Sequence, residues 1–442
     1  MVCVLTDHHR DKKMKKIINP DKKQWLSLCE RPAEDIEDLS KSVQQIFQEI
    51  KQNGDAAVAK YTEIFDGVRL DNTEVSEGEI AGVVNKVAEE LKEAIALAKQ
   101  NIEKFHASQK LTKEVIETSQ GVLCWQETRP IEKIGIYIPG GTAPLFSTVL
   151  MLAVPAKITG CKEIVLCTPP NKEGKINPAI LYTANLIGID KIYKIGGIQA
   201  IGAMTIGTET VPKVYKIFGP GNQYVTAAKQ QAMLEGIAID MPAGPSELLV
   251  LADDTANPAF VASDLLSQAE HGADSQVICI VNDEKLMYQV EREVEKQISV
   301  LPRKDVAEKA IRNSKLILIE DKQKAIDLIN EYAPEHFILA VKEEGFYLEN
   351  LVNAGSVFIG NYTPESAGDY ASGTNHTLPT NGFAKSYSGV NLDSFSKKIT
   401  FQKISTKGIK NIGGAIEIMA AAEGLQAHKN AVTLRLENLG KE

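Results

Sequence analysis

Residues 134–144 read Ile-Gly-Ile-Tyr-Ile-Pro-Gly-Gly-Thr-Ala-Pro, a short apolar run that ends in a glycine-rich turn. Such a run is typical of a buried strand, and similar runs recur along the rest of the chain, separated by longer helical stretches. Consecutive parallel strands need crossover connections, which helices usually provide. The alternation therefore predicts parallel sheets that are covered by helices on both faces.

The strand-like runs form two series, which are divided near the segment Pro-Ala-Gly-Pro at 242–245. The first series comprises 134–138, 164–167, 192–195 and 214–218, and the second comprises 248–251, 277–281, 316–319, 337–341 and 356–359. We therefore expect an α/β protein with two doubly wound, Rossmann-like parallel-sheet domains.

The regions on either side of the two series show helical spacing instead. Apolar residues three and four apart predict a mainly helical region before residue 115, and a helical segment over 415–436 that is interrupted at Gly424. The C-terminal helices have few apolar partners nearby in sequence, which favours contact with another subunit. We expect an N-terminal extension (1–20), a helical region (21–129), two Rossmann-like domains (130–243 and 244–396) and a C-terminal dimerisation tail (397–442).

Composition narrows the class of protein. The 442 residues are 43% hydrophobic and 24% charged, as in soluble globular proteins, and the length indicates several domains. A net charge of −9 argues against a nucleic-acid partner, and the sequence contains no apolar stretch of the roughly eighteen residues that a membrane span needs. The six cysteines form no CxxC pair, and several lie in apolar runs; together with the lack of a secretory signal this favours the cytoplasm.

Four of the seven histidines lie close to carboxylate or amide side chains: His271, His336, His376 and His428. Zinc takes imidazole and carboxylate ligands and more rarely an amide oxygen, and histidine also transfers protons near neutral pH. A single histidine is more often packed in a core or solvated than bound to a metal, so the neighbouring residues decide whether a metal site is predicted. Gln268 stands three residues before His271 after an apolar helical pattern, which predicts that both project from one helix face as a chelating pair.

Glu335 and His336 are adjacent at the start of the strand-like run 336–341. Pro334 before them keeps the preceding helix from continuing. Adjacent side chains of a strand point to opposite faces, so the two residues would have different roles. These patterns together favour a metal site with its own acid and base.

Glycine-rich turns follow three strands of the first series, at 139–144, 196–199 and 219–222. The last resembles the start of a dinucleotide fingerprint, but Tyr224 stands where the third glycine belongs, and taken alone it is better explained as a structural turn. Three such turns at one sheet edge are stronger evidence, because bare backbone amides at helix starts attract anions. A nicotinamide dinucleotide is the leading candidate.

Six blocks of the sequence resemble the histidinol dehydrogenase family, in the family's order and across roughly residues 20–440. The blocks are 138–148 (Ile-Pro-Gly-Gly-Thr-Ala-Pro-Leu-Phe-Ser-Thr), 218–222 (Phe-Gly-Pro-Gly-Asn), 240–247 (Asp-Met-Pro-Ala-Gly-Pro-Ser-Glu), 267–272 (Ser-Gln-Ala-Glu-His-Gly), 333–336 (Ala-Pro-Glu-His) and 373–376 (Gly-Thr-Asn-His). The resemblance implies the last two steps of histidine biosynthesis, in which L-histidinol is oxidised to L-histidinaldehyde and then to L-histidine with two NAD⁺. It also implies one zinc ion per subunit and a homodimer.

The resemblance also implies roles for individual residues. The zinc ligands, which with the metal also hold the substrate, match Gln268, His271, Asp369 and His428. His336 matches the base that takes the hydroxyl proton and also contacts substrate, and Glu335 matches the residue that activates the water added to the aldehyde. Further substrate contacts match Ser246, His376 and Glu423, and the NAD contacts match Tyr137, Gln199 and Asn222. The family's dimer places the segment with Glu423 and His428 in the partner's site, which predicts a shared active site.

Residues 1–13 have no counterpart in the family, so His8 and His9 are not expected to be ligands, and Met14 is a second plausible start. Three alternative functions remain open at this point. The first is a related zinc- and NAD-dependent dehydrogenase that acts on another amino alcohol or hydroxyl compound. The others are a zinc hydrolase, which would not need the glycine turns, and a cofactor-binding regulatory protein, which would not need Glu335 beside His336.

Overall fold

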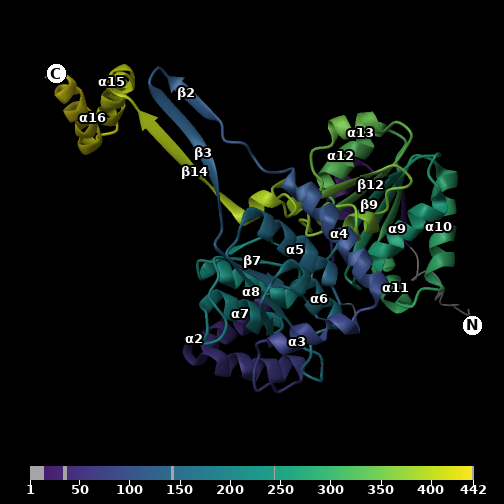
Figure 1. Ribbon diagram of the computed structural model, residues 1–442. Coiled ribbons are helices and arrows are strands. Elements are labelled where there is room, and N and C mark those ends of the chain that lie inside the picture. The colour runs from purple at the N-terminus through teal and green to yellow at the C-terminus, as the bar shows by residue number, and fades with distance from the viewer. Residues whose placement is uncertain (1–13, 33–36, 141–143, 243, 441–442) are drawn as a thin grey trace, which may run out of the picture.

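The computed structural model describes residues 14–32, 37–140, 144–242 and 244–440. Two parallel sheets with helices on both faces form the body, and an arm of strands and helices projects from it (Figure 1). The expected α/β class with two doubly wound domains and a helical tail is confirmed. Residues 1–13, with His8 and His9, lie outside the described residues.

The first sheet has five parallel strands in the order β6-β5-β4-β7-β8. The strands are β4 (Lys133–Tyr137), β5 (Glu163–Thr168), β6 (Lys191–Lys194), β7 (Lys216–Phe218) and β8 (Ala238–Ile239), and the helices between them are α5 (Phe146–Thr159), α6 (Pro178–Ile187), α7 (Gly197–Ile206) and α8 (Gln223–Leu234). Helices α5 and α6 pack on one face of this sheet through one apolar core. Helices α7, α8 and α2 (Glu37–Asp66) pack on the other face through a second core.

The N-terminal helices cover this first half of the body. Within α2 the backbone departs from helical geometry at Gly54, so α2 consists of two helices that meet at a kink. Helix α3 (Glu77–Gly82) follows, and α4 (Glu89–Ala107) packs on α5 through a small apolar core.

The second sheet has six parallel strands in the order β1-β11-β10-β9-β12-β13. The strands are β1 (Lys15–Ile18), β9 (Glu247–Ala252), β10 (Gln276–Val281), β11 (Lys315–Leu318), β12 (His336–Ala340) and β13 (Ser356–Ile359), and the helices are α1 (Trp25–Leu28), α9 (Pro258–Ala269), α10 (Glu284–Ile298), α11 (Lys304–Arg312), α12 (Lys322–Tyr332), α13 (Glu344–Asn350) and α14 (Glu365–Tyr370). Strand β1 lies in the segment expected to be an extension, and it pairs with β11 at the sheet edge.

The arm contains an antiparallel sheet that the sequence pattern does not predict. Strands β2 (Val115–Ser119) and β3 (Val122–Pro130) form a hairpin, and β14 (Ser396–Ile404) pairs with β3 along its whole length. The tail is therefore anchored to a hairpin from a region that was expected to be helical. Helices α15 (Thr406–Ala422) and α16 (Gln426–Leu439) pack on each other at the tip.

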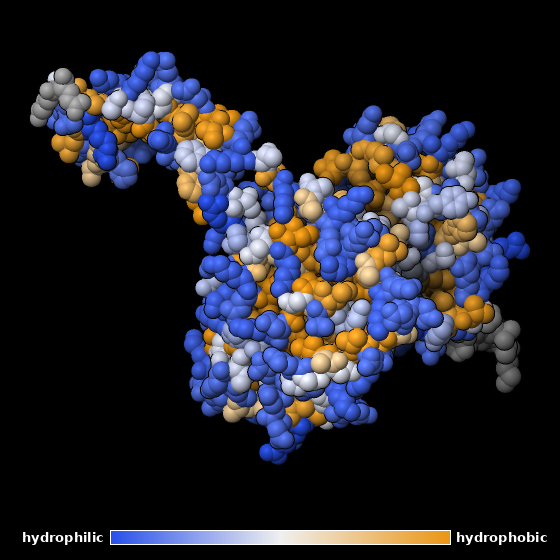
Figure 2. All heavy atoms as spheres, viewed as in Figure 1, coloured by the Kyte–Doolittle hydropathy of each residue, from blue (hydrophilic) through white to orange (hydrophobic). Residues whose placement is uncertain are grey.

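The arm carries apolar side chains at its surface, which Figure 2 shows along its length. Examples on the two tip helices and their connection are Ile418, Met419, Leu425 and Leu434. Within the described ranges, no helix is long and apolar enough to cross a membrane.

Candidate active site

The Glu335–His336 pair lies at the start of β12, beside the start of β9. The backbone N–H of Glu247 donates a hydrogen bond of 2.9 Å to Oε2 of Glu335, and the carbonyl oxygen of Glu247 lies 3.3 Å from Nδ1 of His336. The two side chains do not diverge as expected for neighbours in a strand, because Glu335 stands just before β12. Oε2 of Glu335 lies 3.7 Å from Nδ1 of His336.

The tautomer of His336 follows from this contact. A carbonyl oxygen only accepts hydrogen bonds, so Nδ1 carries the hydrogen and Nε2 is the atom that can accept a proton. Nε2 is buried, has no hydrogen-bond partner among the described residues and lies 3.8 Å from Oδ1 of Asp369. Nε2 is therefore free to accept a proton from a bound molecule.

Burial sets the protonation of the pair. It raises the pKa of Glu335 well above its usual value, and the nearby carboxylates of Glu247 and Asp369 raise it further. Burial lowers the pKa of His336 to about 3, with a further contribution from His271. His336 is thus a neutral imidazole near neutral pH, the form that a proton acceptor needs.

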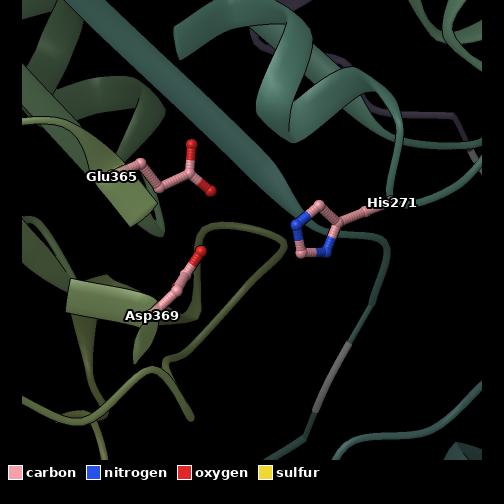
Figure 3. A group of neighbouring side chains, drawn as sticks. All are labelled: His271, Glu365 and Asp369. Carbon is pink, nitrogen blue, oxygen red and sulfur yellow. The ribbon is translucent and has the colours of Figure 1, made fainter. Parts of the chain in front are cut away.

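A group of potential metal ligands lies next to the pair. Ligand atoms of His271, Glu365 and Asp369 all lie within 4.8 Å of one another, and Figure 3 shows the three side chains directed toward the same space. Glu365 and Asp369 come from α14, and His271 comes from the turn after α9. Burial raises the pKa of Asp369 to about 7 and that of Glu365 well above its usual value. A cation in this space would hold both carboxylates ionised.

Gln268 adds an amide to this region. It lies in the last turn of α9 and is fully buried, and neither its Oε1 nor its Nε2 has a hydrogen-bond partner among the described residues. An orphaned buried amide is costly unless something binds it. The expectation that Gln268 and His271 share one helix face is wrong in detail, because α9 ends at Ala269 and His271 follows in a turn, with its N–H bonded to the carbonyl of Gln268 at 3.2 Å.

Of the four residues that match zinc ligands, the structure brings Gln268, His271 and Asp369 to one domain and leaves His428 apart. His428 is exposed on α16, at the tip of the arm, which lies away from the body in Figure 1. Glu423, expected to contact substrate, is exposed on the same arm. Glu365 was not singled out in the sequence, although its four-residue spacing from Asp369 places both carboxylates on one face of a helix.

The two remaining substrate-contact candidates lie in the body. His376 uses both ring nitrogens: Nδ1 lies 2.9 Å from the carbonyl oxygen of Asp369 and Nε2 lies 3.1 Å from the hydroxyl of Thr148 on α5. His376 therefore ties α14 to the first half of the body. Ser246 is half-buried and immediately precedes Glu247.

The three residues that match NAD contacts line the carboxyl edge of the first sheet. Tyr137 ends β4, and its hydroxyl accepts a hydrogen bond of 3.0 Å from the N–H of Gly197. Gln199 is fully buried in the first turn of α7, and its Oε1 lacks a partner among the described residues. Asn222 caps α8 by accepting from the N–H groups of Tyr224 and Val225.

A cleft of about 1640 Å³ opens at this edge, lined by parts of all three glycine turns. Of the first turn, residues 141–143 lie outside the described ranges. Gly219 has a φ of 134°, and a side chain there would meet the carbonyl oxygen of Tyr137. The cleft wall also includes Asp66 from the end of α2, which accepts a hydrogen bond of 3.2 Å from Gln199. Burial raises the pKa of Asp66 to about 6; no local sequence signal points to this residue.

Comparison with known proteins places this site in a family. The sequence pattern that describes histidinol dehydrogenase matches residues 29–436. The chain belongs to the histidinol dehydrogenase family. Histidinol dehydrogenases from Bacteroides fragilis and Bacteroides thetaiotaomicron are 58% and 60% identical to it, over 97% and 96% of this chain and 100% of each relative.

A solved structure agrees with this assignment. The crystal structure of histidinol dehydrogenase from Elizabethkingia anophelis is 60% identical, covers 97% of this chain and 99% of its own, and superimposes with a TM-score of 0.95. The family and the enzyme class expected from the sequence are therefore confirmed.

Proposed function

We propose that the chain catalyses the NAD-dependent oxidation of L-histidinol to L-histidine through L-histidinaldehyde. The observation that carries this proposal is the position of His336 between Glu335 and a group of metal-ligand side chains. Its Nδ1 lies 3.7 Å from Oε2 of Glu335, and its Nε2 lies 3.8 Å from Oδ1 of Asp369. An imidazole-bearing amino alcohol supplies two nitrogens for such a metal and one hydroxyl for His336.

Zinc fits the donors that are present. His271 and Asp369 supply the nitrogen and oxygen atoms that zinc takes, and the orphaned amide of Gln268 offers a further oxygen. When bound, zinc would hold the substrate through its imidazole and amino groups. His428 from a second copy of the chain would complete the ligand set.

NAD fits the cleft at the first sheet. Gly140 and Gly197 line the cleft, and Gln199, which donates a hydrogen bond to Asp66 in the cleft wall, has a buried amide oxygen without a partner among the described residues. Tyr137, Gln199 and Asn222 would contact the cofactor, which supplies the hydride acceptor when bound.

His336 and Glu335 would then divide the proton transfers between the two oxidations. Nε2 of His336 accepts the hydroxyl proton in the first step, because Nδ1 already carries a hydrogen directed at Glu247. Glu335 takes a proton from the water that adds to the aldehyde in the second step. Burial raises the pKa of Glu335 well above its usual value, which makes its carboxylate a stronger proton acceptor.

The homodimer with a shared active site is part of the proposal. Glu423 and His428 are exposed on an arm whose tip carries unpartnered apolar side chains, which supports docking of the arm on a second copy. The tail 397–442 would be the dimerisation element, 130–243 the NAD domain and 244–396 the zinc and catalytic domain. A cytoplasmic location stays a prediction.

Steady-state rates with a panel of amino alcohols test the substrate. NADH formation should have a kcat/KM for L-histidinol that exceeds that for an amino alcohol without an imidazole by at least about a hundredfold, since the metal contact of the ring would be lost. A comparable kcat/KM for both would favour the alternative, a related dehydrogenase acting on another hydroxyl compound. Product formation without NADH would favour a hydrolase.

A further inference from the structure

Arg31 links the two chain segments that hold Glu335 and His336. Its guanidinium pairs with the carboxylate of Glu247 through Nε and, at 2.9 Å, through Nη2. Nη2 also donates to the carbonyl oxygen of Tyr332 at 2.6 Å, and the guanidinium lies over the Tyr332 ring, 4.1 Å from its centroid. Glu247 opens β9, and Tyr332 ends α12 just before Glu335. One side chain from the N-terminal segment therefore contacts both.

Glu247 is also the residue whose backbone holds the pair. Its N–H bonds to Glu335 and its carbonyl oxygen lies beside Nδ1 of His336. The Glu247 side chain is 1% exposed, and its position is further fixed by the Tyr332 hydroxyl, which lies 3.4 Å from Oε2. A displacement of Glu247 would thus move the hydrogen-bond partners of both members of the pair.

The turn that leads into the pair depends on contacts from elsewhere in the chain. Ala333 has a φ of 53°, a left-handed conformation that costs an alanine free energy. The turn is held by the Arg31 contact to Tyr332 and, on its other side, by hydrogen bonds of 2.9 Å from Gly355 to the carbonyl of Pro334 and from Ser356 to the carbonyl of Glu335. Removing Arg31 leaves the turn held mainly from the β13 side.

We propose that Arg31 is a positioning residue for the reaction: by holding Glu247 and Tyr332 together, it sets the orientation of Glu335 and the tautomer of His336. The inference rests on the roles proposed above for that pair. The planar fork of arginine can bind a carboxylate and a carbonyl group at once, whereas a lysine ammonium cannot reproduce both contacts in the same geometry. Small displacements of a reacting group lower rates strongly.

Arg31→Met, with Arg31→Lys as the conservative variant, gives the first test. The kcat for histidinaldehyde oxidation should fall by about tenfold or more in Arg31→Met, while the KM for NAD⁺ and for the aldehyde changes by less than about threefold, because Arg31 touches neither the metal ligands nor the cleft. The kcat of Arg31→Lys should lie between those of the wild-type protein and Arg31→Met. Lys16→Met is the matched control, since it removes an ion pair with Glu291 at the other edge of the same sheet and should leave kcat unchanged.

A double-variant cycle separates positioning from general stability. If Arg31 acts through Glu335, the variant with both Arg31→Met and Glu335→Gln should be about as slow as Glu335→Gln alone. The inference would be overturned if the double variant were slowed by the product of the two single-variant losses. An unchanged kcat in a folded Arg31→Met protein would also overturn it. Should Arg31→Met fail to fold, Glu247→Gln enters the same cycle, because it keeps the shape and an acceptor for Arg31. A wild-type protein without dehydrogenase activity would instead remove the proposed function, and this inference with it.

Discussion

The backbone N–H of Glu247 donates a hydrogen bond of 2.9 Å to Oε2 of Glu335, and this contact orients the carboxylate of Glu335. In the proposed reaction this carboxylate receives the proton of the water that adds to the aldehyde. On the other side of the same residue, the carbonyl of Glu247 leaves Nε2 of His336 as the proton acceptor. The two side chains are thus prepared for separate proton transfers.

Replacing each member of the pair should therefore affect different steps. His336→Asn should slow the oxidation of histidinol, and Glu335→Gln should slow the oxidation of histidinaldehyde by on the order of a hundredfold, as expected for loss of a general base. Separate assays with each compound as the starting substrate measure the two effects. Glu343→Gln, an exposed change in the same domain, should leave both rates intact. Equal losses in both steps for both variants would contradict the division of roles.

Zinc content tests the proposed ligand set. His271→Ala should lower bound zinc from about one per chain to a small fraction, because an imidazole ligand is lost while the sheets around it do not depend on the metal. Metal analysis after dialysis, with circular dichroism as the check on folding, measures this. Glu270→Ala is the matched control from the adjacent position and should retain zinc. A folded His271→Ala protein with full zinc content would show that the ligands lie elsewhere.

The buried carboxyl of Asp66 predicts a specific pH dependence of stability. Burial raises its pKa from 3.8 to about 6, so the folded state binds a proton more tightly than the unfolded state does. The free energy of unfolding should therefore fall as pH rises through this window, and Asp66→Asn should remove that part of the slope. Denaturant unfolding of both proteins at several pH values from 4 to 7 gives the comparison. Parallel pH profiles would mean that Asp66 titrates normally.

Subunit complementation tests the shared site. Consider a heterodimer of a His271→Ala chain and a His428→Ala chain. If His428 binds zinc in the partner's site, one site carries both substitutions and the other site carries neither. Activity should then return to a fraction of sites after subunit exchange. If His428 instead binds zinc in its own chain's site, every site carries one substitution and the mixture stays inactive. Mass spectrometry confirms that the subunits have exchanged.

The parallel sheets could be predicted because their strands are continuous apolar runs. All six residues of β9 and of β10 are buried, and such runs differ clearly from the amphipathic helices beside them. The arm sheet could not be predicted in the same way. Every residue of β2 is exposed, so the alternation of apolar and polar residues that marks a half-covered strand is missing. Strand β1 is short, and its place at the sheet edge depends on pairing with the distant β11.

The residues of the candidate site likewise include some that the sequence predicts and some that it does not. Glu335, His336, Gln268 and His271 are recognisable because residues of the right chemistry lie close together in sequence. Arg31 and Asp66 reach the two sites from the N-terminal segment and from the end of α2, so only the folded chain brings them there. The metal-ligand group also includes Glu365, which lies one helical turn before Asp369 and could have been found from that spacing.

The stoichiometry of NADH formation tests the central claim most directly. The reaction contains zinc-loaded protein, excess NAD⁺ and a limiting amount of L-histidinol. Absorbance at the NADH band gives the amount of NADH formed, and chromatography identifies and quantifies the product. The account predicts two NADH for each L-histidinol consumed, with L-histidine as the product. One NADH with accumulation of the aldehyde, or no NADH from a folded and zinc-loaded protein, would contradict it.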